Sequence, residues 1–218
     1  MSDDRPPAES QLATGLPGPV VFVTGHDDAG KAVLHSRRPV EWMSYDNADM
    51  QMSVAWTTPQ FPVKVDGDQD ITAHDALMAK GSIGLVSPGG TVLRYVDLSP
   101  GYECLMHRTV SVDYGIVLEG TVVSKLENTE TGKQTVMRRG DVMVQRATMH
   151  SWYNPSKTEW ARMVFCLQDC EVPRLASGKK LREDLGRETP GILPSGNDKD
   201  DEPGEPKGEQ GTGTKSSL

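Results

Sequence analysis

The stretch from Gly101 to Gly120 reads G-Y-E-C-L-M-H-R-T-V-S-V-D-Y-G-I-V-L-E-G and carries the most information about the fold. Five residues separate Gly101 from His107, five separate His107 from Asp113, and six separate Asp113 from Gly120. Its second half is rich in β-branched side chains, as strands are, and Gly120 suits a tight turn. The stretch therefore predicts consecutive strand segments on which His107 and Asp113 could face one interior.

A second stretch, from Arg138 to Ser156, reads R-R-G-D-V-M-V-Q-R-A-T-M-H-S-W-Y-N-P-S. Six residues separate Gly140 from Ala147, two separate Ala147 from His150, and three separate His150 from Asn154. Gly140 suits a turn, and Asn154 stands before a proline, which marks the end of a strand. We expect His150 on a strand a hairpin away from the first stretch, with its imidazole directed into the same interior.

The chain around these stretches reads as further short strands at intervals of roughly 8–12 residues, which is typical of a sandwich or barrel. A hairpin loop is expected at residues 128–132. Two short helices are expected, one over residues 73–80 and one that begins after Ser177 and ends at Gly186. The pattern predicts one all-β domain. Its strands are expected at residues 19–24, 31–35, 50–57, 82–86, 91–98, 110–118, 121–126, 133–138, 142–145, 149–153 and 160–167.

Composition divides the 218 residues into a folded part and two tails. Only 36% of residues are hydrophobic and 6% aromatic, which is lean for a globular chain of this length. Residues 1–15 and 196–218 are polar and charged, and they cannot bury enough apolar area to offset the entropy of ordering. We expect both to be disordered and the domain to span residues 16–195, with its barrel core at about 82–170.

The formal net charge of −8 argues against a nucleic-acid partner, which requires a basic face. No apolar run approaches the roughly 18–20 residues of a membrane span. The acidic N-terminus lacks the apolar core of a secretory signal. The three cysteines fit no zinc or redox spacing, so we expect reduced thiols in a cytoplasmic protein.

Both stretches resemble the two-part signature of the cupin superfamily, G-x5-H-x-H-x3–4-E-x6-G followed by G-x5-P-x-G-x2-H-x3-N. The resemblance covers about 55 residues and implies a single cupin (jelly-roll) barrel. Three positions depart from the signature. Thr109 replaces its second histidine, Asp113 its glutamate, and Ala147 its second-motif glycine, with one residue fewer before it.

The same stretches look like the small single-domain cupin proteins of fungi and bacteria. Fungal members are often encoded in polyketide biosynthetic clusters, including clusters for salicylaldehyde-type products. That resemblance implies a tailoring enzyme, an oxidoreductase that acts on a small polyketide-derived molecule in secondary metabolism. It also implies a homodimer, since barrels with a long N-terminal strand segment often exchange strands, and exposed strand edges give a physical motive.

The candidate catalytic residues are His107, Asp113 and His150. Two imidazoles and one carboxylate form a metal-binding set with open positions, for which Fe(II) is favoured and Mn, Ni or Zn are possible. Thr109 could bind a metal weakly or leave a place for water or substrate. The alternative is a metal-free polar network whose histidines act as acid or base in dehydration, isomerisation or cyclisation. A non-catalytic cupin that binds a small molecule is the third reading.

Several neighbouring residues allow two interpretations. Trp56, Trp152 and Thr109 could line the substrate site, although packing in the core also explains both tryptophans. Tyr114 is expected to point away from Asp113 because side chains alternate along a strand. Arg108 and Arg146, which lie near the histidines in sequence, are expected to face solvent, with binding of an anionic substrate group as the alternative.

Overall fold

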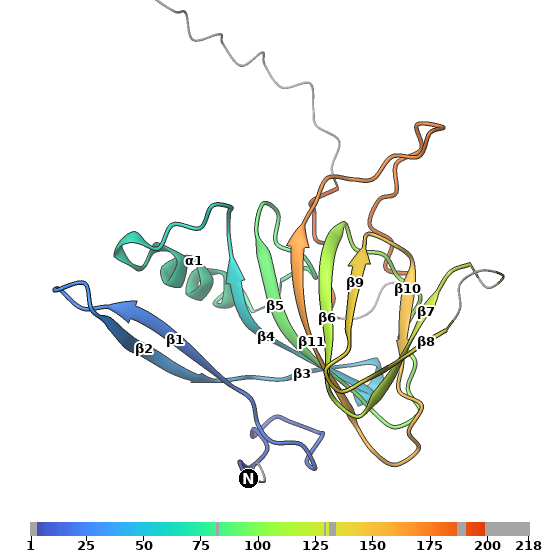
Figure 1. Ribbon diagram of the computed structural model, residues 1–218, viewed down its shortest axis with the longest axis horizontal. Coiled ribbons are helices and arrows are strands. Elements are labelled where there is room, and N and C mark those ends of the chain that lie inside the picture. Colours follow the sequence, from blue (N-terminus) through green and yellow to red (C-terminus); the bar gives the residue numbers. More distant parts are fainter. Residues whose placement is uncertain (1–3, 82, 129, 131–133, 187–190, 199–218) are drawn as a thin grey trace, which may run out of the picture.

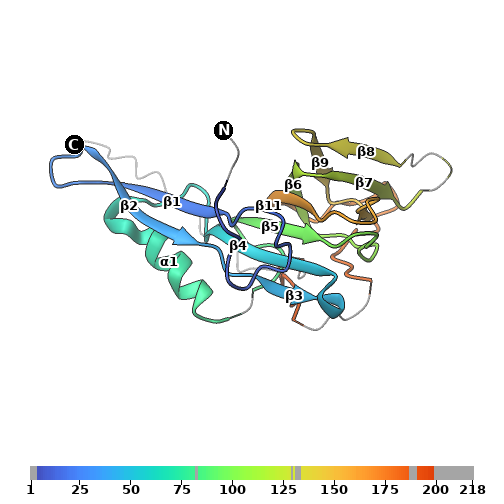
Figure 2. The ribbon, with the colours of Figure 1, turned by 90° about the horizontal axis from the view of Figure 1, so that it is seen from below.

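The computed structural model describes residues 4–81, 83–128, 130, 134–186 and 191–198 (Figures 1 and 2). This part of the chain is built mainly of antiparallel strands, so the prediction of an all-β fold is confirmed. None of its helices is long and apolar enough to cross a membrane.

The strands match the expected positions to within a few residues, apart from a short β3 that the pattern did not predict and residues 83–86, which form no strand. The elements in chain order are β1 (Val20–His26), β2 (Ala32–Pro39), β3 (Met43–Tyr45), η1 (Asp46–Ala48), β4 (Met50–Thr58), η2 (Asp66–Asp68), α1 (Gln69–Met78), β5 (Thr91–Leu98), β6 (Ser111–Glu119), β7 (Thr121–Leu126), β8 (Thr135–Arg138), β9 (Val142–Arg146), β10 (His150–Tyr153) and β11 (Ala161–Asp169).

Two sheets enclose the core. The larger has six strands in the order β3-β4-β5-β11-β6-β9, and the smaller has three in the order β10-β7-β8. They face each other, and Trp152 of β10 packs edge-on against Phe165 of β11 with ring centroids 5.4 Å apart. The named strands of the described residues form no ladder that joins the two sheets, so the expected barrel is a two-sheet jelly roll rather than a closed cylinder.

The remaining strands, β1 and β2, form a separate hairpin that projects from the body beside α1 (Figures 1 and 2). The core lies between the two large sheets, and alternate residues of β5 and β11 point into it. It consists of methionine, aliphatic and aromatic side chains: Met50, Met52, Val86, Val92, Val96, Leu98, Val117, Val122, Met137, Trp152, Ala161, Met163, Phe165 and Leu167.

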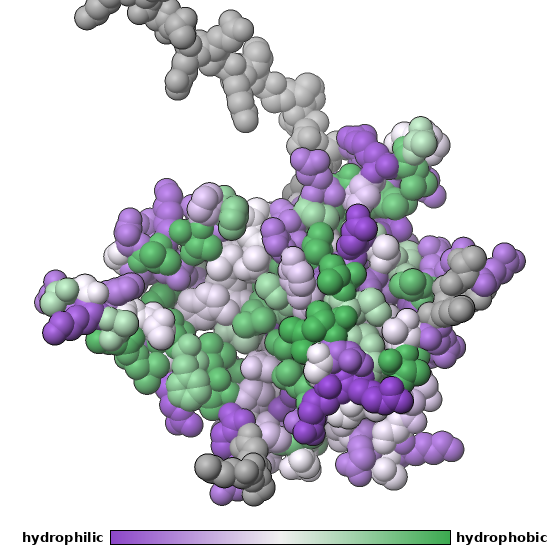
Figure 3. Space-filling model, viewed as in Figure 1, coloured by the Kyte–Doolittle hydropathy of each residue, from purple (hydrophilic) through white to green (hydrophobic). Residues whose placement is uncertain are grey.

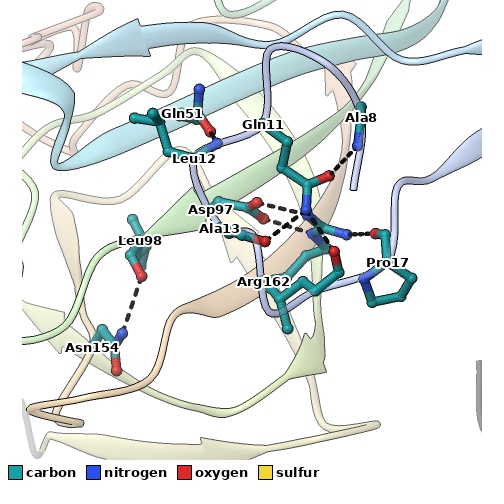
Figure 4. Close-up of polar contacts among 11 residues, drawn as sticks. Ala8, Gln11, Leu12, Ala13, Pro17, Gln51, Asp97, Leu98, Asn154 and Arg162 are labelled. Carbon is teal, nitrogen blue, oxygen red and sulfur yellow. Dashed lines mark hydrogen bonds and ion pairs between the residues drawn. The ribbon is translucent and has the colours of Figure 1, made fainter. Parts of the chain in front are cut away.

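The N-terminal segment corrects the expected tail at residues 1–15, because its described part, residues 4–15, packs on the six-stranded sheet. Ala13 is fully buried, and the side chain of Gln11 donates to the carbonyls of Ala13 and Leu16. Leu12 N–H donates to Gln51 of β4 (Figure 4). A few buried amide contacts hold this polar segment in place although it offers little apolar area.

The segment also covers a buried ion pair on this side of the sheet (Figure 4). Arg162 of β11 donates two hydrogen bonds to Asp97 of β5, at 2.6 and 2.7 Å, and a third to the carbonyl of Pro17 at 2.6 Å. The Arg162 guanidinium also lies over the ring of Trp42, 4.9 Å from its centroid. The Arg162 side chain therefore joins β5, β11 and the N-terminal segment at one point.

The helix predictions were half right. α1 forms over Gln69–Met78, a few residues earlier than expected, because the chain turns into it at Asp68. The second helix, expected over 177–186, is absent. Arg108 and Asp184 instead exchange backbone hydrogen bonds of 2.6 and 2.9 Å, which hold that segment extended. Residues 83–86 are not a strand, and the loop expected at 128–132 lies mostly outside the described residues.

Turn geometry supports the glycine positions of both stretches and explains one departure. Gly120 and Gly140 have φ of +79° and +89°, which glycine adopts without steric cost. Ala147, at the position of a signature glycine, also has a positive φ, of +47°. An alanine in this conformation costs roughly 1–2 kcal/mol, so the loop before His150 is strained.

We expect Ala147→Gly to raise the free energy of unfolding by roughly 0.5 kcal/mol, because it relieves this strain and the flexibility of glycine offsets only part of the gain. Ala161→Gly, a matched change at a buried position in β11, should lower it. Urea denaturation monitored by tryptophan fluorescence would measure both. A loss of stability in Ala147→Gly equal to that in Ala161→Gly would contradict the explanation.

Candidate functional site

The two candidate histidines are brought together by the backbone. His107, in the loop before β6, donates its N–H to the carbonyl of His150 at 2.9 Å, and His150 N–H donates to the carbonyl of His107 at 2.9 Å. A pair that exchanges both hydrogen bonds places its side chains on the same face. The imidazole centroids lie 4.3 Å apart, with the ring planes inclined at 49°.

Each ring is held in one tautomer by a carbonyl two residues before it. His107 Nδ1 lies 2.8 Å from the carbonyl oxygen of Leu105, and His150 Nδ1 lies 2.8 Å from that of Thr148. Carbonyls only accept hydrogen bonds, so Nδ1 carries the proton in both rings. Each Nε2 therefore keeps a lone pair, and among the described residues neither Nε2 has a hydrogen-bond partner.

Burial keeps both imidazoles neutral. It lowers the pKa of His107, and it lowers the pKa of His150 to about 3, with the nearby His107 adding to that effect. Removing a cationic imidazole from water is unfavourable, and two cations side by side would repel each other. At neutral pH the site therefore presents two uncharged rings whose Nε2 lone pairs are available.

Asp113 lies on β6 and points into the interior, but it belongs to a different cluster. Its carboxylate accepts hydrogen bonds from Ser111 at 2.5 Å and Thr109 at 3.4 Å. Burial raises its pKa to about 6, an effect that the two hydroxyls and the nearby Arg94 oppose. Thr109, which replaces the signature's second histidine, therefore binds the carboxylate that replaces the signature's glutamate.

A cavity of about 100 Å³ lies between the sheets and contains both clusters. Its walls are mostly apolar, and their polar side chains include the two histidines, Asp113, Arg94, and Tyr102 hydrogen-bonded to Asp46. It is lined by Asp46, Met50, Met52, Leu85, Arg94, Val96, Leu98, Tyr102, Cys104, Leu105, His107, Thr109, Asp113, His150, Trp152, Phe165, Leu167, Leu185 and Ile192. This composition suits a small, largely apolar molecule with a few polar atoms.

The C-terminal segment, which the sequence did not associate with the site, contributes to the wall through Leu185 and Ile192. It is anchored by Ser195, whose hydroxyl donates to Glu183 at 2.6 Å and accepts the N–H of Val86 at 3.0 Å. Asn197 extends the attachment to the carbonyl of Val110, although the tail was expected to begin at residue 196. Residues 199–218 lie outside the described part of the chain.

The two tryptophans that were predicted to line the substrate site differ in position. Trp152 lines the cavity, but Trp56 does not. Its ring stacks on His74 of α1 with centroids 4.2 Å apart, and Arg38 of β2 lies over it. Trp56 therefore secures α1 and the hairpin arm to β4.

The alternation along β6 places Tyr114 outward, 41% exposed, as expected. Arg108 and Arg146 do not line the cavity. Arg108 donates to the carbonyl of Arg182 at 2.7 Å, and Arg146 is exposed. The arginine that does line the cavity, Arg94, had no motif to mark it.

A second hollow, of about 470 Å³, lies on the outer side of the molecule, between the β1–β2 hairpin, α1 and β4. Its lining includes Arg38, His74 and Asp75. Arg94 and Met52 border both this outer groove and the inner cavity.

The donor set fits a metal ion only in part. In the described residues, no three His, Cys, Asp or Glu side chains lie close enough together to hold one. The predicted set of His107, Asp113 and His150 is therefore not assembled. The imidazole pair does have the features of metal ligands, because each Nδ1–H is fixed by a carbonyl and each Nε2 is free.

The fold and the paired histidines are those of a cupin domain, and known proteins agree. The chain is 37% identical over 192 residues to Phomopsin biosynthesis cluster protein D of Diaporthe leptostromiformis, covering 87% of this chain and 98% of that protein. It is 37% identical to Oryzines biosynthesis cluster protein J of Aspergillus oryzae, over 76% of this chain and 90% of that one.

Similarity extends to a relative with a named activity. The chain is 36% identical to the cupin-domain-containing oxidoreductase fogC of Aspergillus ruber, over 82% of this chain and 85% of that protein. This chain belongs to the family of cupin-domain proteins of fungal biosynthesis clusters. No protein-family model matches it. Among solved structures, an RmlC-like cupin from Shewanella frigidimarina is 11% identical with a TM-score of 0.38, over 60% of this chain and 85% of that one.

The raised pKa of Asp113 predicts a distinctive pH dependence of stability. Between pH 4 and pH 6 the folded protein retains a proton that the unfolded chain, with an ordinary pKa of 3.8, has released. The free energy of unfolding should therefore fall as pH rises through this window. Relative to Asp113→Asn, the wild type should lose roughly 2–3 kcal/mol between pH 4 and pH 7.

Guanidinium denaturation of both proteins across this pH range would measure the difference. Other groups near Asp113, namely Arg94 and the thiols of Cys166 and Cys170, are present in both proteins and cancel in the comparison. Parallel pH profiles for wild type and Asp113→Asn would show that burial does not perturb this carboxyl.

Proposed function

We propose that this protein is a cytoplasmic oxidoreductase of secondary metabolism that acts on a small, largely apolar, polyketide-derived molecule in the inner cavity. The observation that carries the proposal is the pair of neutral imidazoles, His107 and His150, which line a largely apolar cavity and whose Nε2 atoms have no hydrogen-bond partner among the described residues. The named oxidoreductase activity of the relatives supports the redox assignment.

The residues that would hold a metal ion are His107 and His150, through Nε2. Iron(II) is our first choice, with manganese, nickel or zinc as alternatives. When bound, iron(II) would supply Lewis acidity and one-electron chemistry. The other coordination positions of the ion would be open to water or substrate, because the Asp113 carboxylate accepts hydrogen bonds from Ser111 and Thr109 instead.

The chain itself supplies orientation and exclusion of water. The carbonyls of Leu105 and Thr148 fix the two rings, so that the Nε2 lone pairs keep one direction. Trp152 and Phe165 provide a rigid aromatic wall beside them. Leu185 and Ile192 of the C-terminal segment add apolar side chains to the wall, which would limit the access of bulk water to a bound molecule.

A metal-free reaction is the second candidate, and the incomplete donor set favours it. Without a third protein ligand beside them, His107 and His150 could act directly, one neutral imidazole accepting a proton from the substrate. The cavity would then serve a dehydratase, isomerase or cyclase. A purely binding function would use the same cavity without turnover.

Metal analysis of protein purified without chelators separates these functions. We expect stoichiometric iron in the wild type, its loss in His107→Ala and His150→Ala, and its retention in Asp113→Asn, because that carboxylate is bound elsewhere. Loss of iron in Asp113→Asn as well would restore the three-ligand set predicted from sequence. An active wild type that takes up no metal, even when iron(II) is offered, would support acid–base chemistry.

We further propose that the protein is a homodimer joined through the β1–β2 hairpin. Hydrophobic side chains lie at the surface along this arm (Figure 3), where Phe22 is 59% and Leu34 60% exposed. A two-stranded hairpin is barely stable by itself in water, so a second copy packed on these residues would stabilise it.

Sedimentation velocity of the double variant Phe22→Ser/Leu34→Ser tests this proposal, and a monomer is expected where the wild type sediments as a dimer. The control is Val142→Ser/Val144→Ser, which removes equally exposed apolar residues from the outer face of β9 and should remain dimeric. A monomeric wild type, or a control that dissociates while the hairpin variant does not, would contradict it.

A further inference from the structure

Arg94 is a buried cation in the wall of the cavity. It lies on β5, is 5% exposed, and reaches toward the segment that precedes this strand. Its Nη2 donates to the carbonyls of Gly84 at 2.9 Å and Leu85 at 3.1 Å, and its Nη1 contacts the sulfur of Met52 at 3.6 Å. These contacts fix the position of the guanidinium in the wall.

The hydrogen-bonding capacity of Arg94 is not used up by these contacts. A guanidinium has five N–H donors, of which two are bound to carbonyls and one faces a weak sulfur acceptor. The buried Nε has no hydrogen-bond partner among the described residues. A buried donor without an acceptor is costly, by roughly 1–3 kcal/mol, and here the group also carries a charge.

No carboxylate of the described residues forms an ion pair with Arg94 within 4.0 Å. Asp113 is near enough to favour the charged form of Arg94, but its oxygens accept from Ser111 and Thr109 instead. Burial lowers the pKa of Arg94 to about 10, so the side chain is still positively charged at neutral pH.

Arg162, the other deeply buried arginine of the same sheet, differs from Arg94 because its charge is paired with a carboxylate. Arg162 is 3% exposed and binds both oxygens of Asp97, at 2.6 and 2.7 Å. Buried charges in proteins are normally paired in this way, because desolvation is otherwise uncompensated. Arg94 lacks such a carboxylate, and it borders the inner cavity on one side and the outer groove on the other.

The rest of the described lining directs a ligand toward this charge. Arg94 is the one permanent cation among these lining residues, and most of the others are apolar. The cavity also contains the histidine pair, so a molecule held at one end by Arg94 has its other atoms confined between the sheets with the two Nε2 atoms.

We propose that Arg94 binds a carboxylate group of the substrate, and that the substrate class is therefore a small, largely apolar carboxylic acid. This inference rests on the proposal that the inner cavity is the substrate site. The carboxylate would accept from the guanidinium donors that no protein group uses, and charge-assisted hydrogen bonds of this kind are among the strongest in proteins.

Binding of two matched probes tests the inference without knowledge of the natural substrate. Benzoate and benzamide have nearly the same shape, and only benzoate carries a charge. By NMR titration or calorimetry, the wild type should bind benzoate at least tenfold more tightly than benzamide. Arg94→Met should reduce this preference to less than twofold, and Arg94→Lys should leave an intermediate preference because a charge remains.

Arg146→Met is the matched control, since it removes the same charge from an exposed position and should keep the full preference. Equal affinities in the wild type, failure of benzoate to bind, or an undiminished preference in Arg94→Met would overturn the inference. If Arg94→Met does not fold, the inference is tested by the wild type and by Arg94→Lys. A preference for benzoate that is as strong in Arg94→Lys as in the wild type would then contradict the inference.

Two measurements on the same samples keep this inference separate from the metal proposal. His150→Ala should retain the benzoate preference, and its loss there combined with retention in Arg94→Met would place the carboxylate at the imidazoles instead. Iron content is read independently. Iron without a benzoate preference overturns the role of Arg94 alone, whereas a benzoate preference without iron contradicts the metal proposal alone.

Discussion

The buried ion pair between Arg162 and Asp97 connects parts of the chain that lie far apart in sequence. It joins β5 and β11, the two central strands of the larger sheet, and it reaches the carbonyl of Pro17 and the ring of Trp42. Asp97 alternates with residues that face the cavity, so the pair lies on the opposite side of the sheet. The centre of this sheet is thus covered on both faces, by the N-terminal segment on one and by the three-stranded sheet on the other.

That arrangement explains how a chain with few aromatic residues maintains a defined cavity. The cavity walls on β5 and β11 are stiffened from behind by a charged contact that needs correct geometry, because losing either partner would leave an uncompensated buried charge. On the inner side, the reciprocal hydrogen bonds of His107 and His150 set the position of the second wall. Both sides of the site are therefore fixed by directional contacts rather than by apolar volume alone.

The features that could be predicted from the sequence are those that depend on the spacing of neighbouring residues along the chain. Strand positions, the turns at Gly120 and Gly140 and the inward face of β6 follow from alternation and turn chemistry, and the structure agrees. The partners of Asp113 could not be predicted, since the choice between a hydroxyl and a metal ion depends on distances of a few ångströms. Arg94 was missed for a related reason, because the significance of a buried cation lies in the carboxylate it lacks. The N-terminal segment was wrongly predicted to be disordered, because amino-acid composition does not reveal hydrogen bonds made by single buried amide groups.

Arg94 and Met52 have a further consequence through their position, since they border both the inner cavity and the outer groove. These two side chains therefore form a partition between the inner cavity and the surface beneath the hairpin. Shortening Met52 would thin this partition while leaving the Arg94 guanidinium in place. The width of that partition thus offers an engineer a direct way to alter the size of molecule that the inner cavity accepts.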